Sequence, residues 1–306
     1  MPRFIYVART ERRFVLPALI ATLLILCQVS VFSQSTSGIK SLSANEFLQK
    51  TIDAELKAQS KDHSHWMYEV KTKVAGKDEV KWVVQTRDGD IDRLRSVDGQ
   101  PISAEQEKQE ERRIAGLVHK GDEDKKQRRA EQEDDRQMDH LLKMLPQAVI
   151  AKYGEHKGDM VELLYAPNAD FHPSSHEDAV FHAMAGRIWV NEREMRLAEI
   201  EGDLIREVKF YGGLLGYLDQ GGKFNVKQSE VAPGYWEVTM LDVNMHGKIL
   251  FFKTISVQQN EIRSNLQRVP DNLTLAQAAE ELQKRAAQST ANNGSHSSQI
   301  ANGVLR

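Results

Sequence analysis

Hydrophobic and polar residues alternate with a period of two in two blocks of the chain. In the first block, Trp66, Tyr68 and Val70 alternate with polar neighbours, which predicts a meander of about three antiparallel strands before Gly99. No helix-length segment interrupts the second block, so its strands are also expected to be antiparallel. Its turns are marked by glycine-containing dipeptides such as His246-Gly247. The second block predicts strands near 161–166, 181–190, 194–201, 203–211, 222–231, 235–244, 248–257 and 261–268.

Three segments instead show helical spacing. A capping box at Ser43 opens a helix over 43–60, and Thr274 caps another over 274–287. The segment 103–145 is helical in propensity and dense in charge, and Pro146 is expected to end it. Its charged middle is interpreted as a solvated helix face, with a mobile lid or arm as the alternative.

These elements predict an α+β fold. A sheet of roughly eight to eleven strands has more apolar face than a few helices can cover. We therefore expect a curved antiparallel half-barrel with helices on or across its concave face. The expected half-barrel domain spans 43–270 with a charged helical insertion at 103–145. Residues 271–306 are expected to form a C-terminal helix and a disordered tail.

The N-terminus has a different pattern. Four arginines precede an apolar run from Phe14 to Phe32, as in a secretory signal peptide over 1–33 followed by a linker over 34–42. An uncleaved membrane anchor is the alternative, because the run approaches the length of a span. The sequence thus predicts a periplasmic or secreted protein. Cys27 is the single cysteine, so a chain cut after Ser33 has no thiol chemistry.

Composition and motifs narrow the function. A net charge of -3 argues against a nucleic-acid partner. No nucleophile elbow or dinucleotide signature is present, so no catalytic residues, no cofactor and no enzyme activity are predicted. His172, His176 and His182 are weak candidates for a metal site, because their spacing does not match a zinc signature. Exposed loop histidines are the simpler interpretation.

Large aromatic residues on the predicted strands are the remaining signal. They fit an ordinary sheet core, or alternatively the lining of an apolar cavity that binds a lipid. The candidate lining residues are Trp189, Phe210, Phe224, Trp236 and Phe251.

A further signal lies in six segments: Asp98–Ser103, Tyr165–Pro173, Met184–Val190, Val208–Gly213, Gly221–Phe224 and Gly234–Trp236. These segments resemble exported bacterial proteins related to the outer-membrane lipoprotein carrier and sorting proteins, the LolA/LolB/RseB-like group. The resemblance covers roughly residues 60–268 and implies a curved, incomplete antiparallel barrel around helices, whose concave face holds acyl chains in the carriers. The charged segment 103–145 departs from the compact carriers.

The leading hypothesis is an exported envelope protein that binds a lipid or a lipoprotein acyl chain non-covalently. Burial of apolar ligand surface, at about 25 cal/mol per Å², would supply the binding energy. Membrane contact would then come only through the signal segment or the ligand. The alternative is a structural or regulatory interaction module with a filled core, which docks an envelope protein through 103–145. A metal-dependent hydrolase built on the three histidines is the third hypothesis.

Overall fold

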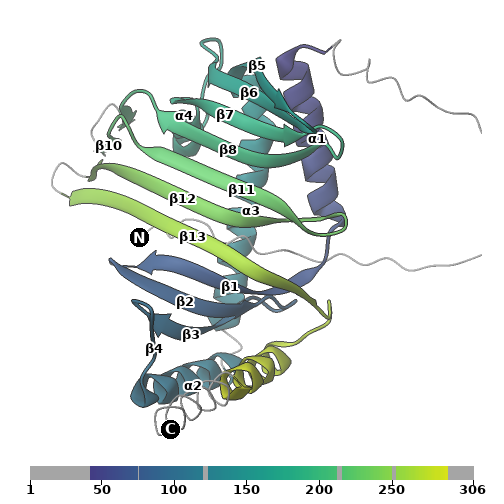
Figure 1. The fold of residues 1–306 in the computed structure, drawn as a ribbon. Coiled ribbons are helices and arrows are strands. Elements are labelled where there is room, and N and C mark those ends of the chain that lie inside the picture. Colours follow the sequence, from purple (N-terminus) through teal and green to yellow (C-terminus); the bar gives the residue numbers. More distant parts are fainter. Residues whose placement is uncertain (1–41, 75, 120–122, 212–215, 250–252, 289–306) are drawn as a thin grey trace, which may run out of the picture.

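A computed structural model describes residues 42–74, 76–119, 123–211, 216–249 and 253–288 (Figure 1). The helices are α1 (Ala44–Lys61), α2 (Ala104–His119), α3 (Glu123–Ala148), α4 (His176–Phe181) and a last helix over residues 275–288. The strands are β1 (His65–Val74), β2 (Lys77–Val84), β3 (Ile91–Val97), β4 (Gln100–Pro101), β5 (Val149–Lys157), β6 (Met160–Pro167), β7 (Met184–Asn191), β8 (Arg196–Leu204), β9 (Val208–Phe210), β10 (Gly216–Leu218), β11 (Lys223–Ala232), β12 (Tyr235–Ile249) and β13 (Lys253–Val269).

All strands belong to one open antiparallel sheet, which confirms the expected α+β class in its coarse form. The order along the sheet is β4-β3-β2-β1-β13-β12-β11-β8-β7-β6-β5, with β9 and β10 attached beside β12. The first strand of the meander therefore pairs with the last strand of the chain, between His65 and Val269 at one end. This long-range pairing joins the two blocks of strands into a single sheet (Figure 1).

Helices α1 and α3 lie on one face of the sheet, behind the strands in the view of Figure 1. Apolar residues of α1, such as Phe47 and Ile52, and of the end of α3, such as Leu145, pack against the inward side chains of β5 to β8 and β11. These side chains are fully or almost fully buried. This packing forms the main core, and we refer to the face that it occupies as the inner face.

Two further clusters cover the strands of the first block. On the outer face, Ile114 of α2 and Leu282 of the last helix pack against Trp82, Met67 and their neighbours. On the inner face, the tip of the β11–β12 hairpin packs over β1, where Tyr235 meets the Trp66 ring edge-on at 5.8 Å between centroids. The first half of β1 is therefore buried on both faces, whereas Lys71 and Lys73 in its second half are exposed.

The outer face of β6, β7 and β8 is polar. Arg187 bonds Glu201 on the neighbouring strand and lies 3.7 Å from the Glu162 carboxylate. These residues alternate along their strands with core residues such as Ile188. The predicted alternation of one apolar and one polar face is therefore present, as antiparallel sheets allow.

Local signals place the helix starts. The capping box at Ser43 is complete, because its hydroxyl accepts from the Glu46 amide and the Glu46 side chain accepts from the Ser43 amide. Ser103 and Thr274 make the same reciprocal bonds with the glutamines three residues later. These three predicted helix starts are confirmed. The charged segment forms two helices, α2 and α3, and Pro146 lies inside the last turn of α3.

Several strand boundaries differ from the prediction. The sheet has 13 strands, more than the eight to eleven expected, because β4, β5 and β10 were not predicted. The separate strands predicted near 248–257 and 261–268 are wrong, since β13 is one strand over Lys253–Val269. His246-Gly247 is not a turn, since β12 continues through both residues. A Cβ atom at Gly247 would lie 2.1 Å from the Tyr217 carbonyl oxygen of β10, so the glycine permits a close strand contact there.

Other predictions fall outside the described residues. They are the signal peptide over 1–33, nearly all of the linker over 34–42, and the disordered part of the C-terminal tail. Across the ranges that are described, no helix combines the length and the apolar composition needed to cross a bilayer.

Candidate functional site

The aromatic residues predicted to line an apolar cavity do not converge on one place. Phe224 is buried in the main core beside Phe181, and Phe210 packs at its margin against His176. Trp189 lies on the outer face, 5.3 Å from the Lys157 ammonium. Trp236 is half-buried, and its indole N–H donates to Glu194 at 2.8 Å. Phe251 lies outside the described residues.

The inner face is also less apolar at its centre than the prediction required. Strand register places Glu261 and Arg263 of β13 on the same face as Leu241 and Phe224. Arg263 and Glu261 form an ion pair at 2.6 Å, and both side chains are largely buried. Burial opposes the charge on Arg263, but the neighbouring Tyr68 and Glu261 raise its pKa. This ion pair places charge where an acyl chain was expected.

The three histidines proposed as metal ligands make other contacts. The Nε2 of His182 donates to the Asn168 carbonyl at 2.6 Å, and Arg206 approaches its Nδ1 at 3.3 Å. His176 packs between the rings of Phe210 and Tyr211. Within the part of the chain that the structure describes, no three His, Cys, Asp or Glu side chains are grouped closely enough to hold a metal ion.

Ser174 and His140 both contact Asp178 near α4, but the three residues are not arranged as a catalytic triad. The Ser174 hydroxyl donates to Asp178 at 2.6 Å, and His140 bonds the other carboxylate oxygen at 2.8 Å. Burial alone would raise the pKa of Asp178, but the bonds from Ser174 and His140 outweigh it and hold the pKa below its ordinary value. Since the hydroxyl faces the carboxylate and not the imidazole, the serine is not paired with a histidine base as in a hydrolase triad.

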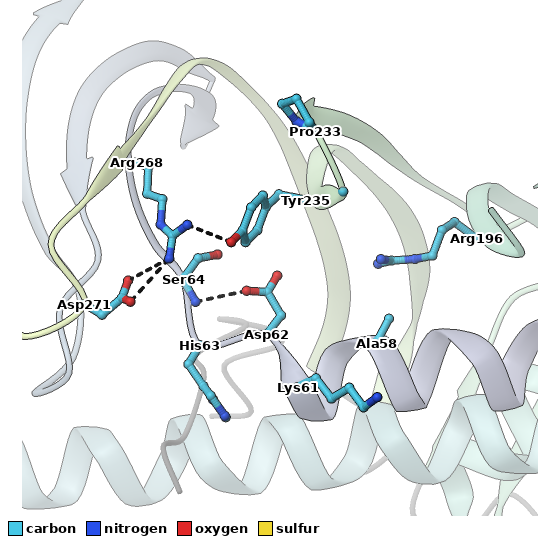
Figure 2. A pocket seen from close by; sticks show the side chains of 11 residues that line it. Ala58, Lys61, Asp62, His63, Ser64, Arg196, Pro233, Tyr235, Arg268 and Asp271 are labelled. Carbon is cyan, nitrogen blue, oxygen red and sulfur yellow. Dashed lines mark hydrogen bonds and ion pairs between the residues drawn. The ribbon is translucent and has the colours of Figure 1, made fainter. Parts of the chain in front are cut away.

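The described residues form a polar pocket of about 570 Å³ at the end of α1 (Figure 2). It is open to solvent, and five separate parts of the chain line it: the end of α1, the connection to β1, the start of β8, the β11–β12 turn and the corner after β13. None of the described aromatic candidates lines it. The lining residues are Ala58, Lys61, Asp62, His63, Ser64, Arg196, Pro233, Gly234, Tyr235, Arg268 and Asp271.

Two arginines are held in the pocket wall by carboxylates. Arg196 makes a two-point contact with Glu55 of α1, at 2.8 and 3.0 Å, and Glu55 is fully buried. Arg268 donates to the Tyr235 hydroxyl at 2.7 Å and to Asp271 at 3.3 Å. Figure 2 shows the Arg196 and Arg268 guanidinium groups on opposite sides of the Asp62 carboxylate. Arg196 is thereby held in a buried ion pair, whereas the contacts of Arg268 lie at the surface.

The end of α1 contributes the other polar groups of the pocket. The Asp62 carboxylate accepts from the Ser64 amide at 3.0 Å, which fixes its orientation. Lys61 is exposed, and no ion pair to it is found among the described residues. The Nδ1 atom of His63 is buried and has no hydrogen-bond partner among the residues that the structure describes.

Comparisons with protein-family models, curated proteins and solved structures found no match. The resemblance to the lipoprotein carrier group therefore stays a prediction. The sequence did not indicate the pocket, although the predicted strands 222–231 and 235–244 flank the Pro233-Gly234 turn that forms one wall. The arginines of the pocket gave only a weak sequence signal, because single arginines at strand ends are common on protein surfaces.

Proposed function

We propose that this protein is a non-catalytic binding module that holds a small polar ligand in the pocket at the end of α1. The observation that carries the proposal is the pocket itself, whose volume lies in the range of small-molecule sites. Its wall is held in position by the Glu55–Arg196 and Arg268–Tyr235 contacts. Such preorganisation favours binding, because little side-chain freedom is lost.

In this proposal, the sheet with α1 and α3 on its inner face is a half-barrel whose interior is occupied by its own helices. Support comes from the main core, in which α1 and the end of α3 cover the apolar side chains of β5 to β8. An acyl-chain ligand requires an uncovered apolar face, so this covering favours a polar ligand over a bare acyl chain. Export to the cell envelope stays part of the proposal, on the basis of residues 1–33.

The test is to fill the pocket and follow a bound ligand. Ala58 lines the pocket, so Ala58→Trp places an indole inside it, whereas Lys57→Trp adds the same group on an exposed position of the same helix that does not line it. The full-length protein is purified gently from its own cells and examined by native mass spectrometry. We expect a small-molecule adduct on the wild type and on Lys57→Trp, and its loss from Ala58→Trp.

Thermal unfolding gives an independent readout. A ligand at 100 times its Kd stabilises the folded state by about 2.7 kcal/mol, so its removal by dialysis lowers the Tm. The Tm of Ala58→Trp should not respond to dialysis. An adduct that persists on Ala58→Trp, or repeated recovery of the wild type without any adduct, would contradict the proposal.

A further inference from the structure

The pocket is lined by charges of both signs. Lys61, Arg196 and Arg268 contribute positive charge, and Asp62 and Asp271 contribute negative charge. In Figure 2, the Asp62 carboxylate lies between Arg268 on one side and Lys61 and Arg196 on the other, so both signs of charge occur along the lining. Behind the wall, the buried Glu55 balances Arg196, so the region as a whole is close to neutral. A ligand with a single charge would meet repulsion from part of the lining wherever it sat.

We propose that the ligand is a zwitterion that carries an ammonium group together with a carboxylate or a phosphate. This inference rests on the proposed function, because it specifies the ligand of the same pocket. Two sources supply this chemistry: a short peptide with free termini, or the phosphoethanolamine headgroup of a lipid.

The ammonium group binds beside Asp62. This residue follows directly after α1, where the carbonyl groups of the last turn give the helix end a partial negative charge. The Asp62 carboxylate is already oriented by the Ser64 amide, and a carboxylate has room for about four hydrogen-bond donors. The helix end and the carboxylate therefore favour a cation at the same place.

The anionic group binds at Arg268. Its guanidinium is oriented by the Tyr235 hydroxyl at 2.7 Å, and its bonds to Asp271 are long, at 3.3 and 3.4 Å. A guanidinium has five N–H donors, so donors remain for a carboxylate or phosphate oxygen.

The experiment compares matched probes by isothermal titration calorimetry on the full-length protein. Alanyl-alanine carries both charges, its N-acetyl derivative only the negative charge, and its methyl ester only the positive charge. Phosphoethanolamine represents the lipid headgroup, with inorganic phosphate as its anion-only counterpart and ethanolamine as its cation-only counterpart. We expect at least one zwitterion to bind tenfold or more tightly than both singly charged relatives. Binding of the peptide alone or of phosphoethanolamine alone supports the inference and identifies the source.

Two variants assign the charges. Asp62→Asn keeps the acceptor for the Ser64 amide, and we expect it to abolish the preference for the zwitterion over its anion-only relative. Arg268→Gln should instead abolish the preference over the cation-only relative. Asp53→Asn, an exposed carboxylate on α1 outside the pocket, should leave every affinity unchanged.

Equal binding of zwitterion and singly charged probes by the wild type would overturn the inference and leave the proposed function standing. Absence of binding by every probe would also overturn it. The proposed function is tested separately. It is contradicted if Ala58→Trp keeps the small-molecule adduct, or if the wild-type protein is repeatedly recovered without one. The wild-type comparison does not depend on the folding of any variant.

Discussion

Replacing Glu55 by alanine is expected to lower the free energy of unfolding by about 3–5 kcal/mol, the usual effect of removing one partner of a buried ion pair. The Glu55 side chain is fully buried, and the side chain of its partner Arg196 is only 12% exposed. The carboxylate accepts two bonds from Arg196, one from the Leu197 amide at 3.2 Å and one from Gln59 at 3.0 Å. Alanine leaves the guanidinium without its counter-charge and the Leu197 amide without its acceptor.

The assay is equilibrium urea unfolding followed by tryptophan fluorescence, since the chain has 4 tryptophans. Asp53→Ala removes an exposed carboxylate from the same helix and should change the unfolding free energy by no more than about 0.5 kcal/mol. The double variant Glu55→Leu with Arg196→Met removes both charges, and it should recover most of the lost stability. A loss below about 1 kcal/mol for Glu55→Ala would refute the argument that this ion pair joins α1 to β8.

Three other perturbations test separate parts of the fold. Gly186→Ala should destabilise the protein by about 1–3 kcal/mol in a thermal melt, because a Cβ atom there would lie 2.0 Å from the Glu201 carbonyl oxygen. The control Gly116→Ala has open space around it in α2 and should be neutral or stabilising in the same melt. Asp178→Asn should cost about 1–3 kcal/mol at pH 7. Since the pKa of Asp178 is held below its ordinary value of 3.8, its stabilising effect is present above that value and is lost as the pH falls through the lowered pKa, so wild type and variant should converge in acid unfolding curves. Asn45→Ala removes the amide that bonds the Val149 carbonyl and the Ala151 amide at the open edge of β5, so light scattering on heating should detect earlier aggregation than in wild type.

The local sequence determined the elements whose signals lie within a few residues. Each of the capping boxes at Ser43, Ser103 and Thr274 needs only a side chain and the backbone three residues away, so pattern alone located these helix starts. The alternation along β1, β2 and β3 likewise identified the meander. One apolar and one polar face followed from the same period of two.

Signals that depend on distant neighbours were misread or missed. Gly247 has the composition of a turn, but it lies within β12 because the backbone of β10 approaches it. β5 was missed because most of its residues are exposed at the sheet edge, where apolar alternation is weak. Phe224 looks like a cavity residue by sequence, yet Phe181 and the main core enclose it. A single strand cannot indicate which side chains will cover it.

The sequence by itself determined an antiparallel, helix-bearing sheet and the starts of its helices, because these depend on periodicity and on bonds between near neighbours. Only the tertiary structure decided that α1 and α3 fill the inner face and that a polar pocket lies at the end of α1. That pocket brings Asp62, Arg196 and Arg268 together from distant parts of the chain. Their proximity depends on the pairing of β1 with β13 and on the β11–β12 hairpin packing over β1, which are contacts that no local pattern encodes.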